Sequence, residues 1–344
     1  MKEQKAQVKT SFFKKIFIKI CRIFGYEIID QSNFYIPTQE KNLSENLNIP
    51  GKKSITLPLG EVKISRKVNA LTIIFRSCTN INMLTQNKKR LFGQNKSEYT
   101  FRSLNSIITS LRKAKESFPN IEFEIIVVDH NSKKNDLNQM TKQLNNANIN
   151  NSVISLNVNE FSNKIEKINA ENKKVTDNQI SNMSNIHKSL LIAKDKCKDL
   201  IYFVEDDYIH QKNVFPEMIL TYERIASQTK KELILCPADY PYLYSTIDTS
   251  KIFFGNMRHW RTVNETLITF LTSKKMITKY LNELKLMSTI RHHPMEQKLH
   301  EIYEKEYCLS PIPSLAMHCS NINSTYGLPP NFDWKKIWEE NEIK

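Results

Sequence analysis

The sequence predicts an α/β fold with a mainly parallel central sheet and helices on both faces. Three observations support this prediction. Short apolar runs of strand length alternate with longer stretches in which apolar residues recur at the helical period. The strand-length runs are apolar at almost every position, as in sheets that are covered on both faces. One of them, Leu200–Val204, is followed directly by Glu205, Asp206 and Asp207.

The composition fits one large domain, or one and a half domains of average size: the chain has 344 residues, and 40% of them are hydrophobic. Lys and Arg number 50 against 36 Asp and Glu, a net charge of +14, which favours an anionic partner. That partner is a phosphorylated substrate, an anionic membrane surface or a nucleic acid. We disfavour nucleic acid because the basic residues are dispersed and no recognition motif occurs.

The six cysteines form no C-x-x-C pair, which argues against a zinc ribbon or a redox motif. Four of them lie in apolar or strand-like surroundings, as reduced core cysteines do, so we expect a reducing compartment and a cytoplasmic protein. No apolar run reaches the roughly 18 residues of a membrane span. The chain has only 6 glycines and lacks both common Gly-rich phosphate-binding motifs.

Residues 1–24 are basic and predict an amphipathic helix. One half of this helix is apolar and the other half is basic, and the two sets are Phe12, Phe13, Ile16, Phe17, Ile20, Cys21 and Phe24, and Lys14, Lys15, Lys19 and Arg22. Such a helix can lie on an anionic membrane surface, pack on the domain or bind a partner. We expect peripheral association with the inner membrane face. Residues 25–67 are rich in turn residues and predict a linker or an extended arm.

Residues 68–320 are expected to form the compact domain, and residues 321–344 a tail with a terminal helix. Residues 157–179 are polar and predict a loop or an irregular helix. The expected strands are Ala70–Phe75, Ile121–Val128, Val153–Leu156, Leu200–Val204, Glu232–Cys236 and Leu309–Met317. The expected helices are Tyr99–Lys115, Ile180–Lys194, Val214–Ala226, Met276–Leu286, Met295–Tyr303 and Trp334–Ile343.

The three carboxylates after Leu200–Val204 indicate a ligand site. Adjacent carboxylates repel one another, and they are costly at the end of a buried strand unless a cation lies close to them. Ligands of open α/β sheets bind outside the carboxyl ends of the strands. Mg²⁺ or Mn²⁺ carrying a phosphate group would suit that position. The alternative is an acidic turn on the surface.

Two segments resemble a known family. The segment EIIVVDHNS at Glu124–Ser132, followed by a helix and by DLIYFVEDDYI at Asp199–Ile209, resembles the nucleotide-sugar half of GT-A fold glycosyltransferases, closest to family 2. The resemblance extends from Leu71 to His318. It implies a GT-A (Rossmann-like) domain with a nucleotide-sugar half at residues 68–210 and an acceptor half at residues 211–320.

The activity that the resemblance implies is a metal-dependent, inverting glycosyltransferase of the hexosyltransferase type. Such an enzyme moves a sugar from a nucleoside diphosphate sugar to a glycan or lipid-linked acceptor, here in cell-surface polysaccharide synthesis. Two alternatives remain open. One is a catalytically inactive GT-A module that binds carbohydrate. The other is a sugar nucleotidyltransferase, which the lack of a Gly-rich loop disfavours. Metal-dependent nucleotide binding coupled to donor hydrolysis would separate the enzyme from the inactive module.

Roles for individual residues follow from the same resemblance. In that family an Asp at the end of a strand, here Asp129, contacts the base of the nucleotide. The later D-x-D triplet, here with Glu205 in first place, holds the ribose and the metal. Expected donor-binding residues are Arg76, Asp129, Asn185, Glu205 and Asp206. Expected ligands of Mn²⁺ or Mg²⁺ are Asp207, Glu205 and His318. PMEQ at Pro294–Gln297 looks like the element that carries the catalytic base, which makes Glu296 the candidate.

Several of these residues have other interpretations. Asp239 and Glu265 are rival candidates for the base. Asp129 could only cap a turn, and His318 could be a hydrogen-bonded core histidine. The segment with Arg258, Trp260 and Arg261 suits an acceptor site because aromatic rings stack on sugars and arginines hold phosphates. A core tryptophan with solvent-facing arginines explains the same pattern equally well.

Overall fold

The computed structural model describes residues 12–26, 56–57, 60–61, 63–80, 90–169, 172–245, 247–292 and 294–343. The chain divides into two units, residues 1–45 with 56–61, and residues 46–55 with 62–344. The first unit holds helix α1 (Phe12–Ile23) and the short antiparallel pair β1 (Thr56–Leu57) and β2 (Gly60–Glu61). The remainder of the expected arm at residues 25–67 lies largely outside the described residues.

Helix α1 carries large apolar side chains that are exposed, among them Phe12, Phe13, Phe17 and Phe24. It forms over the segment for which the sequence predicts an amphipathic helix, with Lys15, Lys19 and Arg22 among its basic residues. None of the helices in the described part of the chain is long and apolar enough to cross a membrane.

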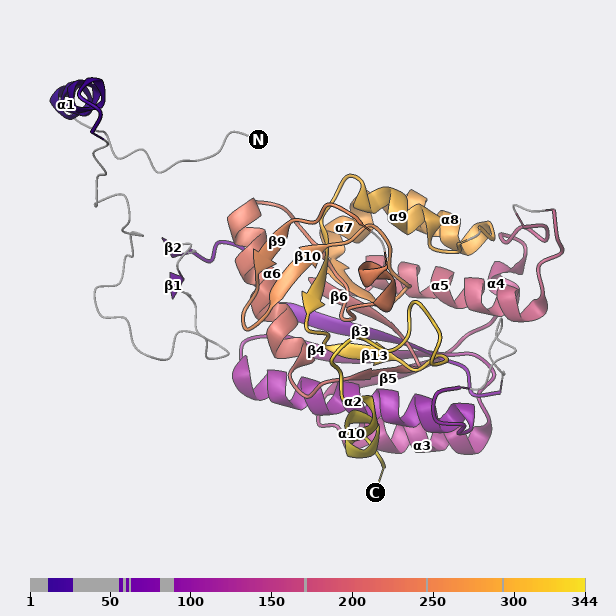
Figure 1. The fold of residues 1–344 in the computed structure, drawn as a ribbon. Helices are drawn as coiled ribbons and strands as arrows, with labels where there is room; N and C mark the ends of the chain where they lie inside the picture. The colour runs from indigo at the N-terminus through magenta and orange to yellow at the C-terminus, as the bar shows by residue number, and fades with distance from the viewer. Residues whose placement is uncertain are drawn as a thin grey trace. The chain divides into compact units, whose positions relative to one another are not determined.

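The second unit is built around a nine-stranded sheet with the order β5-β4-β3-β6-β11-β8-β12-β10-β9 (Figure 1). Strands β5, β4, β3 and β6 are parallel, and among the remaining described strands of this sheet β11 and β10 run in the opposite direction. The bounds are β3 (Ala70–Ser77), β4 (Glu122–Asp129), β5 (Asn150–Ser155), β6 (Leu200–Glu205), β8 (Ile234–Leu235), β9 (Ile252–Phe254), β10 (His259–Thr262), β11 (Phe270–Ser273) and β12 (Cys308–Ile312). The predicted α/β class with a mainly parallel central sheet is confirmed.

Helices cover both faces of this sheet (Figure 1). The long helix α2 (Lys96–Ser117) and α3 (Lys134–Asn145) lie on one face, and α6 (Val214–Thr229) packs against α2. Helix α5 (Asp177–Asp195) lies on the other face and begins with a capping box, in which Thr176 and Gln179 satisfy each other's backbone N–H groups. The remaining described helices are α4 (Asn159–Ser162), α7 (Lys274–Lys279), α8 (Leu281–Thr289), α9 (Gln297–Tyr303), α10 (Trp334–Glu340) and the 3-10 turn η2 (Pro241–Tyr244).

Burial follows position in the sheet. Strand β3 is central and all of its residues are buried, whereas most of edge strand β5 is exposed. Each buried Leu, Ile, Val or Phe contributes about 1.5–3 kcal/mol to folding. The central parallel strands therefore form the buried core from whose ends the residues of the site extend.

Four predictions of local structure were wrong or incomplete. Helix α3 was not expected, although two parallel strands need a crossover of this kind. The segment Met276–Leu286 belongs to two helices that meet at Tyr280. The segment Leu309–Met317 divides between β12 and β13 (Ala316–His318), which lie in different sheets. Strands β9, β10 and β11 were not predicted, because each has only three or four residues, too few to show a clear period in the sequence.

Candidate functional site

The acidic triplet lies where three parallel strands end together. In the parallel ladders, Ser77 pairs with Asp129, and Arg76 pairs with Glu205. The carboxyl ends of β3, β4 and β6 therefore meet at one edge of the sheet. Asp206 and Asp207 form the turn between β6 and a short strand, β7 (Tyr208–His210).

Arg76 forms an ion pair with the first acid of the triplet. Its Nη2 lies 3.0 Å from the Oε1 of Glu205, and its Nη1 donates a hydrogen bond of 3.1 Å to the Oδ1 of Asn182 on α5. Burial raises the pKa of Glu205, the Arg76 charge opposes that effect, and Asp207 adds to it. The net result is a raised pKa, because Arg76 compensates the charge of Glu205 only in part.

Asp206 points into the protein and anchors the turn. Its Oδ2 accepts hydrogen bonds from the Thr100 hydroxyl at 2.9 Å and from the Cys78 backbone N–H at 3.2 Å. Its Oδ1 forms an ion pair with the Nζ of Lys96, the first residue of α2. These contacts connect the triplet to the end of β3 and to the start of α2. Asp206 is thus buried and fully engaged with the protein.

Asp207 and His318 face each other. The Oδ1 of Asp207 lies 3.6 Å from the Nε2 of His318, and its Oδ2 lies 3.7 Å from the Nζ of Lys96. Burial would raise the pKa of Asp207, but Lys96 and His318 outweigh burial and hold that pKa well below its usual range. For His318 the effects are reversed: burial lowers its pKa, and the stronger influence of Asp207 leaves the pKa raised.

The orientation of His318 is fixed by its surroundings. Strand β13 pairs with β7 so that His318 lies opposite Tyr208, and the two rings stack with centroids 4.8 Å apart. The Nδ1 of His318 lies 3.0 Å from the Tyr326 backbone oxygen, so a proton on Nδ1 donates to that oxygen. This arrangement directs Nε2 toward Asp207, and loss of the proton from Nε2 would free its lone pair for a metal ion.

The fit of these residues to a divalent cation can be judged from their number and spacing. Within the described residues, no group of three or more His, Cys, Asp or Glu side chains is placed to hold a metal ion. Asp207 and His318 provide two ligand atoms at a separation compatible with one ion. Because Mg²⁺ is commonly held by one or two carboxylates together with substrate phosphates, two protein ligands suffice for a donor-dependent site.

Glu296 lies at the N-terminal boundary of helix α9. Burial raises its pKa, the negative charge of Glu205 raises it further, and the resulting pKa is about 7. Glu205 is close enough in space to influence this pKa, although 91 residues separate the two carboxylates in the chain (296 − 205). A carboxylate with a pKa near 7 is well matched to proton transfer at neutral pH.

The two rivals for the catalytic base have other partners. Asp239 is buried and forms an ion pair with Arg261, and it accepts a hydrogen bond from the Tyr244 hydroxyl. Glu265 accepts a hydrogen bond of 2.9 Å from the hydroxyl of Tyr326. Both carboxylates hold other side chains in place, which makes Glu296 the better candidate.

Asp129 and Asn185 both make local contacts at the end of β4. Asp129 accepts hydrogen bonds from the hydroxyls of Ser77 at 2.6 Å and Ser132 at 2.5 Å, and from the Ser132 N–H at 3.3 Å. Asp129 is thus a turn-capping residue, whatever else it contacts. Asn185 on α5 donates to the Val128 carbonyl at 2.9 Å and accepts from the Ser189 hydroxyl at 3.3 Å. Its amide therefore fixes the helix to the strand.

The expected acceptor segment forms the hairpin of β9 and β10, and its three residues lie in different environments. Trp260 is fully buried, and its Nε1 lies 3.5 Å from Glu217. A ring in the core cannot stack on a sugar, so the acceptor role expected for Trp260 is corrected to a packing role. Arg258 contacts the Pro313 carbonyl at 2.9 Å and Gln211 at 2.7 Å. Arg261 lies over the ring of Tyr244, with its Cζ 4.6 Å from the ring centroid.

Sequence reasoning missed Lys96, Thr100 and Tyr326, which contact the triplet or its neighbours. Lys96 and Thr100 lie four residues apart and therefore on one face of α2. Starting the helix at Lys96 rather than Tyr99 would have placed this pair on one face. Nothing in the sequence indicates that Tyr326, in the tail, lies beside His318.

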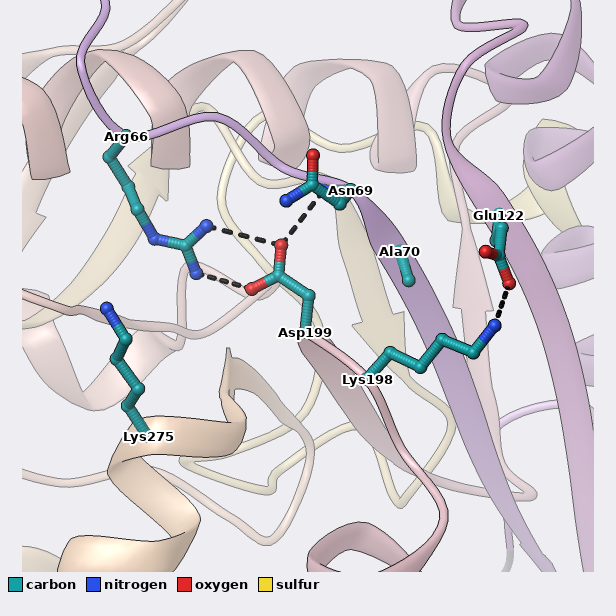
Figure 2. A pocket seen from close by; sticks show the side chains of 7 residues that line it. All are labelled: Arg66, Asn69, Ala70, Glu122, Lys198, Asp199 and Lys275. Atoms are coloured by element: carbon teal, nitrogen blue, oxygen red, sulfur yellow. Dashed lines mark hydrogen bonds and ion pairs between the residues drawn. The ribbon is translucent and has the colours of Figure 1, made fainter.

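A separate cavity of about 270 Å³ lies at the opposite edge of the sheet, where β3 and β4 begin (Figure 2). Figure 2 shows that Arg66 and the Asn69 backbone N–H bind Asp199 there, and that Lys198 pairs with Glu122. Arg66 and Lys275 also pair with Glu232. Because these charges compensate one another across the cavity, we assign it a structural role.

Comparisons with known proteins leave the family open. No family model and no curated protein matches the chain. Among solved structures, the galactosyltransferase LgtC in complex with donor and acceptor sugar analogues is similar at 12% identity and a TM-score of 0.30, over 62% of this chain and 63% of that one. The bifunctional glycosyltransferase WbbM is similar at 12% identity and a TM-score of 0.32, over 67% and 36%.

A UDP-glucose pyrophosphorylase complexed with UDP-glucose is similar at 7% identity and a TM-score of 0.36, over 78% of this chain and 96% of that chain. For the two glycosyltransferases, the match to the present chain spans less than two thirds of the length of LgtC and of WbbM. Likenesses at this level do not assign an activity. The function is therefore argued from the site.

Proposed function

We propose that this protein is a GT-A type glycosyltransferase that moves a sugar from a nucleoside diphosphate sugar to a hydroxyl group of a glycan or lipid-linked acceptor. The observation that carries this proposal is Glu296, a half-buried carboxyl at the start of α9 whose pKa of about 7 is raised in part by Glu205 of the acidic triplet. A base beside a polyphosphate site suits the transfer of a group from phosphate to a hydroxyl.

The donor site is the edge formed by the ends of β3, β4 and β6. Arg76 and Glu205 lie at its centre, and Asp129 lies beside them. A carboxylate can accept about four hydrogen bonds. Asp129 can therefore accept a hydrogen bond from the nucleobase of the sugar donor in addition to its protein contacts. Asp206 and Asn185, which are engaged with the protein, support the donor site by positioning the turn and the end of β4.

A Mn²⁺ or Mg²⁺ ion would be held by Asp207 and His318, with Glu205 close by and the diphosphate completing its shell. The bound metal supplies Lewis-acid neutralisation of the leaving diphosphate. One imidazole ligand among oxygens favours Mn²⁺. Burial is the main cause of the raised pKa of Glu205, and a cation bound close by would favour its charged form.

The chemical step follows from the role of Glu296. As the acceptor oxygen forms its bond to the anomeric carbon, the bond from that carbon to the diphosphate oxygen breaks, and the acceptor proton passes to Glu296. A single displacement of this kind inverts the anomeric configuration. Positioning the base within hydrogen-bond reach contributes about 10²–10⁴ to the rate.

The acceptor is proposed to approach from the side of β10. A cavity of about 220 Å³ there is lined by Tyr242, Thr262, Asn264 and Glu265, a mixture of aromatic and polar groups. Arg261 precedes Thr262 in the same strand, and Arg258 lies in the preceding turn. Tyr326 joins this cavity to the site, because its hydroxyl binds Glu265 and its carbonyl oxygen contacts His318. A glycan suits such a surface.

We also propose that helix α1 rests on the anionic inner face of a membrane, which would bring the enzyme to lipid-linked acceptors of polysaccharide synthesis. Its aromatic side chains are exposed, and Lys15, Lys19 and Arg22 supply the opposite charge to anionic headgroups.

The decisive experiment is calorimetric titration with UDP, GDP and CDP, each in the presence of Mn²⁺, Mg²⁺ or EDTA. We expect one nucleotide to bind in the micromolar range with a metal, and this binding to be lost in Asp207→Ala. Asp136→Ala, on the first turn of α3, is the matched control and should bind as the wild type does. Absence of binding for every nucleotide and metal would refute the donor site.

A further inference from the structure

We propose that Lys96, anchored on Asp206, is a tethered cation that occupies the divalent-metal position beside Asp207 while no donor is bound, so that metal and nucleotide bind together rather than separately. This inference rests on the donor site proposed above. It adds a residue and a mode of regulation that neither the sequence pattern nor the proposed mechanism requires.

The position of Lys96 is the first support. Its Nζ forms an ion pair with the Oδ1 of Asp206 and lies 3.7 Å from the Oδ2 of Asp207. The side chains of Lys96, Asp206 and Asp207 are 13%, 9% and 11% exposed, so little water screens these charges. Lys96 opens helix α2, which makes its backbone part of a long packed element rather than of a mobile loop.

The charge balance of the triplet is the second support. Each acid has a cationic or protonatable partner in the protein: Arg76 for Glu205, Lys96 for Asp206, and His318 with Lys96 for Asp207. Three buried carboxylates without cations would be costly, and here side chains supply the compensation. The donor-free site therefore has no strong electrostatic demand for a metal ion.

Competition follows from this geometry. The Asp207 carboxylate has His318 on one oxygen and Lys96 near the other, so an ion bound by Asp207 would be a close neighbour of the Lys96 ammonium. Like charges at such distances in a site with little water repel one another strongly. A metal ion alone must therefore displace Lys96 or bind weakly.

A diphosphate changes this balance, because its negative oxygens can accept both the metal ion and the lysine. The bound diphosphate then raises the affinity for the metal ion, and the bound metal ion raises the affinity for the diphosphate by the same factor, as linkage requires. Lys96 is a flexible point charge on a four-carbon stem, which suits a move from a carboxylate to a phosphate oxygen.

The test is Mn²⁺ binding, measured by calorimetry without nucleotide and then with inorganic pyrophosphate. We expect Lys96→Ala to bind Mn²⁺ alone at least tenfold more tightly than the wild type. The gain should shrink when pyrophosphate is present, and it should vanish in Lys96→Ala combined with Asp207→Asn. Lys113→Ala removes an exposed lysine from the same helix and should bind Mn²⁺ as the wild type does.

Equal Mn²⁺ affinity of the wild type and Lys96→Ala without pyrophosphate would overturn the inference. Lys96→Arg, which keeps a positive charge and is the milder change for folding, should not gain affinity, and a tenfold gain in this variant would also overturn it. Sugar transfer is measured separately. A wild type that binds Mn²⁺ tightly alone and transfers sugar would refute the role of Lys96 and leave the proposed function standing.

Discussion

Arg76 and Glu205 are direct neighbours in the parallel ladder between β3 and β6, and their side chains form an ion pair of 3.0 Å. The ladder brings together two residues that are 129 positions apart (205 − 76). Because the pair sits on the last residues of the ladder, it links the core of the sheet to the acidic triplet. Glu205 in turn raises the pKa of Glu296, so the ion pair influences the candidate base.

Replacing Arg76 by Ala should destabilise the protein. The change leaves Glu205 without its cation, and breaking a buried ion pair in this way costs about 3–5 kcal/mol. We expect the low end of that range, because the Glu205 side chain is 28% exposed. Urea unfolding measures the change, with Arg76→Lys as the variant that keeps the charge and should lose less. Wild-type stability of Arg76→Ala would contradict a stabilising role.

Replacing Glu296 by Gln should lower kcat by about 10²–10⁴ without weakening nucleotide binding, because a general base acts on the acceptor proton and not on the donor. Glu301→Gln is the matched control, since Glu301 lies on the same helix and pairs with Lys298. Initial rates and calorimetry check the two parts. A variant with normal kcat would transfer the role of base to Asp239 or Glu265.

The pH profile should follow the pKa of Glu296. A base must be deprotonated to act, so kcat/KM should be constant well above pH 7 and should fall about tenfold per pH unit below pH 7. The negative charge of Glu205 contributes to the raised pKa, so Glu205→Gln should move this acid limb to lower pH. The limb is expected to be unchanged in Glu301→Gln. A shift to higher pH in Glu205→Gln would be the wrong sign.

Gly255→Ala should destabilise the hairpin of β9 and β10 by about 1–3 kcal/mol, the usual cost of overpacking. An added Cβ would overlap the indole of Trp260 and would lie 2.6 Å from the Thr221 hydroxyl oxygen. Thermal or urea unfolding measures the loss. Met257→Ala, at an exposed position in the same turn, should change stability little. Equal stability of Gly255→Ala and the wild type would argue against tight packing around Trp260.

Helix α1 gives a separate prediction about membranes. Phe13→Ser with Phe17→Ser removes two exposed aromatic side chains, which should release the protein from vesicles that contain anionic lipid. Co-sedimentation with anionic and with zwitterionic vesicles measures this, and nucleotide binding should be unaffected. Binding to anionic vesicles that survives the double substitution and high salt would exclude α1 as the anchor.

The sequence by itself determined the α/β class and the position of the acidic triplet. Both depend on local features: the apolar strands follow from short-range patterns, and a buried strand that ends in three acids marks its own carboxyl end. Glu296 was also named from its local sequence, and the structure places it so that Glu205 influences its pKa.

Only the tertiary structure decided which cations face these acids and which aromatic ring is buried. Lys96 is 110 residues from Asp206, and their ion pair depends on how α2 packs beside the sheet. The pattern around Trp260 is the same for a core residue as for a sugar platform, and the pairing of β10 with β12 and β9 settled it in favour of the core. Contacts of this kind arise from ladder register and packing, which no local period in the sequence encodes.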